Sequence, residues 1–208
     1  TLEGRITQES VLVSSFGVNA EAIFATVKQV QIIACGTSYH AGLVAKYWFE
    51  DILRLPCQVE VASEFRYRNP VLQDNTLFVT ISQSGETADT FAALQQVNQL
   101  KQSLNIVTLS ICNVAESSLT RESDLVYLTQ AGPEIGVAST KAFTTQLVVL
   151  ALLMTAVGKV QKIMETAQEK RIIAGLHKLP KLINKALEHE STIEKMAELF
   201  ADKQHALF

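Results

Sequence analysis

Cysteine is scarce in this 208-residue chain, and the few cysteines present are not clustered. Cys35, Cys57 and Cys112 form no CxxC pair of the kind that structural zinc sites use, and an odd number of thiols does not suit a disulfide framework. The histidines show no metal-ligand spacing either. The sequence therefore predicts no bound metal, and its cysteine usage is typical of a protein that stays in a reducing cytoplasm.

Positive charge is also in short supply. The 18 Lys and Arg residues are outnumbered by 21 Asp and Glu residues, and no basic run is interleaved with aromatic side chains. Nucleic acid is not expected as a partner, because the chain has no broad positive field to attract a nucleic-acid backbone.

A membrane partner is not expected either. The first residues are polar where a signal peptide is apolar. The apolar run at 147–157 is shorter than the roughly 18 residues that span a bilayer, and we expect it to be a buried helix.

What the chain does contain is a regular alternation between two patterns of apolar residues, one typical of helices and one typical of buried strands. Its 48% hydrophobic and 19% charged residues are enough to bury a core. Between residues 30 and 130, stretches of helical spacing alternate with short apolar runs that predict strands. The five predicted strands are "QIIAC", "CQVEVAS", "TLFVTIS", "NIVTLSIC" and "DLVYLT". Strands joined by helices run parallel, so the predicted fold is α/β: a three-layer, doubly wound, flavodoxin-like parallel sheet followed by C-terminal helices.

The same alternation divides the chain into three parts. Residues 1–28 form a lead-in with one helix, residues 29–158 form the sheet unit, and residues 159–208 continue in helical segments. The closing "KQHALF" predicts the beginning of a further strand, so we expect the chain to be a fragment of a longer protein. The helices after residue 139 carry more apolar surface than one sheet face needs. We therefore expect them to pack on another domain or on a second subunit, and we expect a dimer.

Two polar turns interrupt this apolar pattern, "CGTS" at 35–38 and "SQSGET" at 82–87. Each follows a predicted strand and precedes a predicted helix, so both lie at the same edge of the sheet. The first turn of a helix has unpaired N–H groups and the positive end of the helix dipole, which suit a phosphate. The Ser and Thr hydroxyls add donors, while Gly36 and Gly85 allow close backbone approach. The turns therefore predict a phosphate site without Lys or Arg. Ordinary helix caps are the alternative.

Motifs for other chemistries are missing. The chain has no GxxxxGK[ST] or GxGxxG, so neither a nucleotide nor a dinucleotide cofactor is predicted, and we expect no cofactor. It also has no GxSxG serine nucleophile.

A third polar stretch, "AGPEIGVASTKAFTTQ", follows the last predicted strand. Its Gly and Pro residues mark a loop that we expect to close over the same strand ends, and Ser139 and Thr140 stand at a predicted helix start. Lys141 could neutralise a ligand's charge or act as an amine nucleophile, although a solvated lysine is the simpler interpretation. Glu86 and Asp89 could form a carboxylate pair for acid-base chemistry, or supply favourable charge at the start of a helix.

Taken together, "ACGTS", "SQSGETADT" and "EIGVASTKAFTTQ", with "ASEFRYR" and the final "DKQHALF", closely resemble one half of a known enzyme family. It is the isomerase half of the glucosamine-6-phosphate synthases, which are glutamine-fructose-6-phosphate aminotransferases (isomerizing). That half consists of two sugar isomerase (SIS) domains. The resemblance implies a first SIS domain at 29–158 and a helical connection, 159–208, towards a second one. The family's phosphate contacts fall on Ser38, Ser82, Gln83, Ser84 and Thr87, and its sugar contacts on Thr37 and the Val137 backbone, with Ser139 as a further candidate.

The resemblance also implies a reaction. Ammonia released from glutamine in a separate glutaminase domain is joined to fructose 6-phosphate, and the product is isomerised to glucosamine 6-phosphate for amino-sugar synthesis. The family's acid-base glutamate, Schiff-base lysine and partner-subunit histidine are expected beyond residue 208, so no catalytic residue is expected in this chain. Two alternatives stay open: a non-catalytic sugar-phosphate sensor from a regulator, and a structural or dimerising domain whose hydroxyl turns are only caps.

Overall fold

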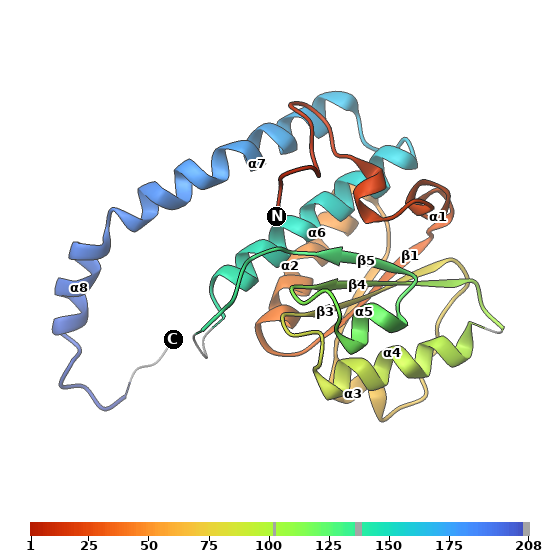
Figure 1. The fold of residues 1–208 in the computed structure, drawn as a ribbon, viewed down its shortest axis with the longest axis horizontal. Helices are drawn as coiled ribbons and strands as arrows, with labels where there is room; N and C mark the ends of the chain where they lie inside the picture. The colour runs from red at the N-terminus through yellow and green to blue at the C-terminus, as the bar shows by residue number, and fades with distance from the viewer. Residues whose placement is uncertain (102, 136–138, 206–208) are drawn as a thin grey trace.

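A computed structural model of the chain describes residues 1–101, 103–135 and 139–205. Its centre is one parallel sheet of five strands in the order β2-β1-β3-β4-β5, with helices on both faces (Figure 1). The predicted α/β fold is confirmed. The strands are β1 (Gln29–Ala34), β2 (Cys57–Val61), β3 (Thr76–Ser82), β4 (Ile106–Cys112) and β5 (Leu125–Leu128). The helices are η1 (Val13–Phe16), α1 (Ala20–Thr26), α2 (Gly36–Leu53), α3 (Ala62–Arg66), α4 (Ala88–Leu100), α5 (Ser118–Glu122), α6 (Lys141–Val160), α7 (Thr166–Leu187) and α8 (Glu190–Glu198).

The central strands are buried on both sides, which explains their continuous apolar runs. Every residue of β3 is buried, and it pairs with β1 on one side and β4 on the other. The register aligns Ala34 with Ile81 and Ser82 with Cys112. The carboxyl ends of β1, β3 and β4 therefore meet at one edge of the sheet, where the polar turns begin.

Two hydrophobic cores cover the two faces of the sheet. The larger one joins the sheet to α1, α2 and α6, with Phe24, Phe49 and Leu153 fully buried. The smaller one joins the other face to α3, α4 and α5, with Phe65 and Leu94 fully buried. The molecule therefore has the three layers expected of a doubly wound sheet.

Helix α6 is the one helix of the described residues that is long and apolar enough, by length and composition, to cross a membrane. Its most apolar window is 61% buried, and the helix lies against α1 and α2 in the larger core. The apolar run at 147–157 is the buried helix that the sequence predicts.

The N-terminal segment, residues 1–16, packs on the larger core and contributes the buried Val11 and Phe16 to it. Glu169 at the start of α7 is 7% exposed and accepts hydrogen bonds from the Ser10 hydroxyl at 2.7 Å and the Val11 N–H at 3.0 Å. The ammonium group of Lys159 lies 3.2 Å from the same carboxylate. A buried acid at the beginning of α7 thus fixes both the segment and the helix.

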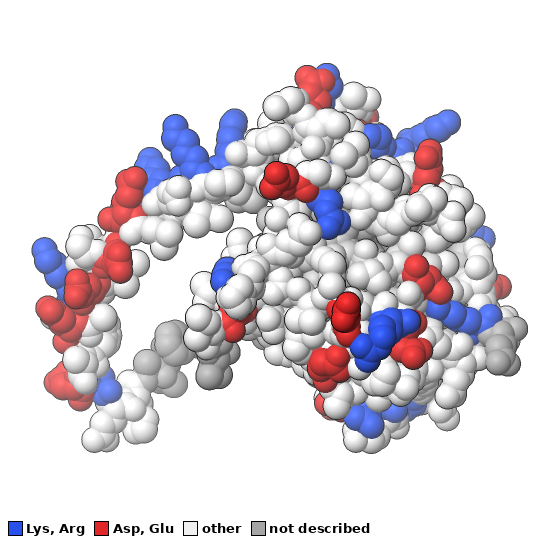
Figure 2. Space-filling model, viewed as in Figure 1, with Lys and Arg blue, Asp and Glu red and all other residues white. Residues whose placement is uncertain are grey.

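The second half of α7 and all of α8 leave the sheet (Figure 1). Ile173 and Leu176 of α7 are buried, but α8 has no buried residue. We call residues 180–205 the arm and residues 20–160 the sheet body. Figure 2 shows basic side chains along α7 and acidic side chains around α8. The closing strand predicted at "KQHALF" falls partly on residues 206–208, which lie outside the described residues.

Candidate functional site: a hydroxyl-lined cavity at the sheet edge

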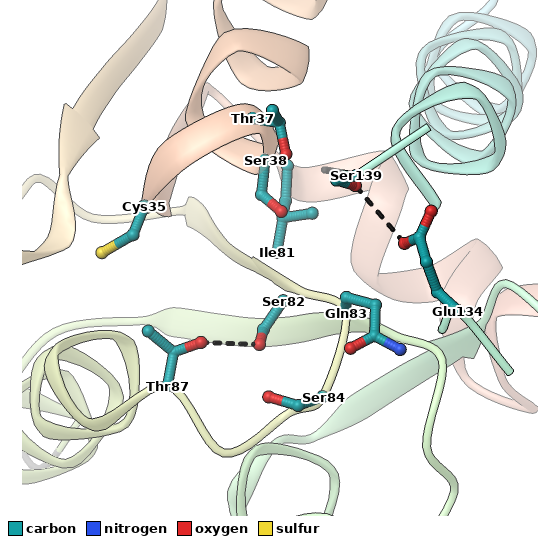
Figure 3. A pocket seen from close by; sticks show the side chains of 10 residues that line it. All are labelled: Cys35, Thr37, Ser38, Ile81, Ser82, Gln83, Ser84, Thr87, Glu134 and Ser139. Carbon is teal, nitrogen blue, oxygen red and sulfur yellow. Dashed lines mark hydrogen bonds between the residues drawn. The ribbon is translucent and has the colours of Figure 1, made fainter. Parts of the chain in front are cut away.

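A cavity of about 270 Å³ lies at the carboxyl ends of β1 and β3 (Figure 3). Seven of the eight residues predicted to bind substrate line it: Thr37, Ser38, Ser82, Gln83, Ser84, Thr87 and Ser139. The eighth, Val137, lies outside the described residues. Cys35, Ile81 and Glu134 complete the lining. The volume is close to the lower end of ligand pockets, so the cavity suits one small metabolite.

The first turn brings β1 directly into α2. Cys35 is extended, Gly36 has φ +57°, and the helix begins there, with Thr37 and Ser38 in its first turn. The side chain of Cys35 does not cap the helix. The N-terminus of α2 therefore faces the cavity with two hydroxyls beside it and with no side chain of the N-cap residue occupying its N–H groups.

The second turn is held by its own hydroxyls. The Ser82 hydroxyl accepts the Gly85 N–H at 3.0 Å and lies 2.9 Å from the Thr87 hydroxyl, and the Ser84 hydroxyl accepts the Glu86 N–H at 3.1 Å. Gly85 has φ +69°, and a Cβ there would lie 2.0 Å from Ser117 Oγ. Only glycine fits this turn.

Helix α4 starts after Thr87, whose side chain makes no capping bond to it. Two helices of 18 and 13 residues thus begin at one cavity without the ordinary side-chain cap at the N-cap position. Neither N-cap side chain bonds its own helix, so the alternative that these turns are simple caps finds no capping bond at Cys35 or Thr87 and stays open to test by binding. An anion placed between the two helix ends would meet unpaired N–H groups, two dipoles and the hydroxyls of both turns.

Glu134 lines the cavity as well, although no sequence motif predicted a role for it. Among the described residues it is the one charged side chain in the lining, and its carboxylate points towards Ser139 on the side of the cavity opposite Thr87 (Figure 3). Its carboxylate accepts the backbone N–H of Thr140 at 2.8 Å, and hydrogen bonds from Thr140, and then Ala142, hold the pKa of Glu134 below its usual value. An acid six residues before a predicted helix start is the only sequence signal that could have indicated this contact.

The loop that carries Glu134 is tied to the sheet by Asn113, the residue after β4. Its side-chain oxygen accepts the Thr129 hydroxyl at 3.0 Å and the Ala131 N–H at 2.8 Å, and its amide donates to the Gly132 carbonyl at 2.8 Å. A second hollow of about 650 Å³ lies beside Asn113 and shares Gln83 and Glu134 with the first cavity. These two side chains therefore stand between the two spaces.

The other candidate groups lie elsewhere. Glu86 accepts the Ser118 N–H at 2.7 Å, and Asp89 pairs with Arg66 at 2.7 Å, so these acids do not form a pair facing the cavity. Lys141 is exposed and does not line the cavity.

Burial raises the pKa of Cys57 and Cys112 to about 12, so neither is a thiolate near neutral pH. Among the described residues, no group of three or more His, Cys, Asp or Glu side chains is placed to hold a metal ion.

Known proteins resemble both the sequence and the fold. A model of the SIS domain matches residues 23–156. The chain is 60% identical over all 208 residues to glutamine-fructose-6-phosphate aminotransferase (isomerizing) of Pseudomonas syringae pv. tomato, and 56% identical to that of Vibrio cholerae. A solved C-terminal domain of glucosamine-fructose-6-phosphate aminotransferase from Francisella tularensis superposes with a TM-score of 0.90 and 44% identity, covering 97% of this chain and 56% of that one. The chain spans 34% of the length of the curated relatives.

Proposed function

The chain belongs to the SIS domain family, and on that premise we propose that it is the sugar-phosphate-binding part of a glutamine-fructose-6-phosphate aminotransferase (isomerizing). Its ligands would be fructose 6-phosphate and glucosamine 6-phosphate. The observation that carries the proposal is the hydroxyl-lined cavity at which the N-termini of α2 and α4 meet. The identity to aminotransferases over the whole chain supports the choice of enzyme, and it does not favour the regulatory alternative.

The phosphate would sit where the two helix ends face each other. Ser38 from α2 and the hydroxyls of Ser82, Ser84 and Thr87 would donate to its oxygens, together with the Gln83 amide. No Lys or Arg among the described residues lines the cavity, so binding would rest on hydrogen bonds and helix dipoles and would depend weakly on salt. The sugar would extend towards Thr37 and Ser139.

The role of this unit in the reaction would be to position the substrate. Fixing the phosphate holds the sugar carbons in one place for groups supplied from elsewhere, and such positioning contributes strongly to rate. The acid-base glutamate, the Schiff-base lysine and the histidine of a neighbouring subunit would come from a second SIS domain and a homodimer. Ammonia would come from a glutaminase domain. Such an enzyme would act in the cytoplasm, and this chain alone would bind the sugar phosphate without turning it over.

A thermal-shift titration tests the binding. Fructose 6-phosphate and glucosamine 6-phosphate should stabilise the chain, and unphosphorylated fructose should not. Ligand at about 100 times its dissociation constant adds roughly 2.7 kcal/mol, which is a shift of several degrees. The variant Ser82→Ala, Ser84→Ala, Thr87→Ala should lose this shift while it stays folded, because it removes three hydroxyls of the cavity.

A matched control replaces three exposed hydroxyls outside the cavity, Thr26→Ala, Ser103→Ala and Ser191→Ala. It should keep the full ligand-induced shift. No stabilisation of the unsubstituted chain by either phosphosugar, at concentrations up to tens of millimolar, would contradict the proposal. An equal shift with unphosphorylated fructose would contradict the assignment of the phosphate to the hydroxyl turns.

A further inference from the structure

Three long helices begin around the cavity, but their N-termini differ. Helices α2 and α4 present hydroxyls and no side-chain cap from the N-cap residue. Helix α6, which starts at Lys141, has its N-terminus bound by a carboxylate from the preceding loop. The third possible anion site at this cavity is therefore already taken by an anion that belongs to the protein.

That anion is Glu134. One carboxylate oxygen accepts the Thr140 N–H at 2.8 Å and the Ala142 N–H at 3.4 Å, and the other lies 3.5 Å from the Ser139 hydroxyl (Figure 3). These contacts favour the ionised form, and they lower the pKa of the group. Glu134 therefore carries a full negative charge near neutral pH, and the other described residues that line the cavity have hydroxyl, amide, thiol or apolar side chains.

We propose that Glu134 is a specificity-determining residue that restricts the cavity to ligands with a single anionic end. The proposal rests on the proposed function, because it assumes that the phosphate of the ligand occupies the cradle formed by α2 and α4. A second phosphate or carboxylate on the same small ligand would then lie near the Glu134 carboxylate. The N-terminus of α6, which would otherwise stabilise such a group, cannot do so while Glu134 occupies it.

The size of the cavity sets the strength of the effect. A sphere of 270 Å³ is about 8 Å across, so we take about 8 Å as the separation between a second anionic group of the ligand and the Glu134 carboxylate. At effective dielectric constants between those of water and of a protein surface, one pair of like charges at this distance changes an affinity by roughly 2- to 30-fold. The positive charge of Lys141 offsets part of this repulsion, since it lies close enough to contribute to the lowered pKa of Glu134. We therefore expect discrimination of about tenfold.

The test compares fructose 6-phosphate with fructose 1,6-bisphosphate by calorimetric titration of the whole chain. The measured quantity is the ratio of the two dissociation constants. Glu134→Gln removes the charge and keeps the shape, so it should lower the preference for the monophosphate by about tenfold. Raising the salt concentration with the unsubstituted chain should weaken the same preference, because it screens the repulsion without any change in the fold.

Glu86→Gln is the matched control. Glu86 also binds the N–H group at a helix start, that of Ser118 at 2.7 Å, and it stands in the hydroxyl turn, but it does not line the cavity. This variant should change the ratio by less than about twofold. An unchanged ratio in Glu134→Gln, or a ratio independent of salt, overturns the inference while the proposed function stands. No binding of fructose 6-phosphate to the unsubstituted chain overturns both.

Discussion

The helices of the sheet body and the helices of the arm both carry apolar stripes, but only the stripes of the body are covered. In α2, Phe49 and Leu53 are at most 2% exposed because α6 and the sheet lie against them. In the arm, Leu187 is 65% and Phe200 63% exposed. Amphipathic spacing thus shows that a helix has a face to cover, and it does not show what covers it. The expectation of packing on a second domain or subunit stays a proposal for the arm.

Pro180 stands at the border between these two regions. It lies inside α7, where proline lacks the N–H for the helical hydrogen bond and crowds the carbonyl of the preceding turn. Before it, Leu176 is buried and Leu179 packs on the larger core, whereas Leu182, Ile183 and Leu187 after it are exposed. The two regions should therefore respond very differently to the same substitution.

Leucine truncation should show the largest contrast. Leu53→Ala leaves a cavity in a packed core next to Gly158, where a Cβ would lie only 2.5 Å from the Leu53 side chain. It should lower the free energy of unfolding by about 2–5 kcal/mol. Leu187→Ala removes an exposed side chain and should change that free energy by less than about 0.5 kcal/mol. Urea denaturation followed by circular dichroism measures both. A loss above 1 kcal/mol in Leu187→Ala would mean that the arm is packed in solution, for instance in a dimer.

Glycine-to-alanine substitution should have opposite signs in the sheet body and on the exposed face of α7 that leads into the arm. Gly85→Ala puts a side chain on a residue with φ +69° and into Ser117, so it should destabilise the chain by about 1–3 kcal/mol and abolish binding of fructose 6-phosphate. Gly175→Ala adds a methyl group on an exposed position of α7 with nothing within 4 Å. It should stabilise the chain by up to about 1 kcal/mol. Thermal unfolding with and without ligand checks both, and a neutral Gly85→Ala would contradict the tight turn.

Much of the sheet body was predictable, because its strands are buried runs and its helices have clear spacing. The strand-to-helix turns were predictable for the same reason: "CGTS" and "SQSGET" stand where the period changes. The short helix α3 (Ala62–Arg66) was missed, since five residues are too few to show a helical period. The contact of Glu134 was missed because a loop acid reaches its partner N–H through the fold of the chain, and no local pattern records that.

The smallest expected effect concerns Glu169, the acid that fastens the N-terminal segment to α7. Burial of Glu169 raises its pKa, but hydrogen bonds from Ser10 and Val11 and the charge of Lys159 outweigh burial, so the pKa lies below its ordinary value. An acid with a depressed folded-state pKa stabilises the fold above its unfolded pKa of about 4.3, and this contribution is lost as the pH falls through the folded pKa. Glu169→Gln should therefore lose about 1 kcal/mol at pH 7 and show a weaker acid-induced loss of stability.

The arm again supplies the comparison, because Glu198→Gln makes the same substitution at an exposed glutamate of α8. It should leave both the stability at pH 7 and its pH dependence nearly unchanged. Hydrogen exchange distinguishes the local cause, since the Val11 amide donates directly to Glu169 and should exchange faster in Glu169→Gln than in the unsubstituted chain. Equal exchange rates at Val11 would mean that the N-terminal segment is held by other contacts, such as Arg5 over the Tyr127 ring, and that Glu169 does not fasten it to α7.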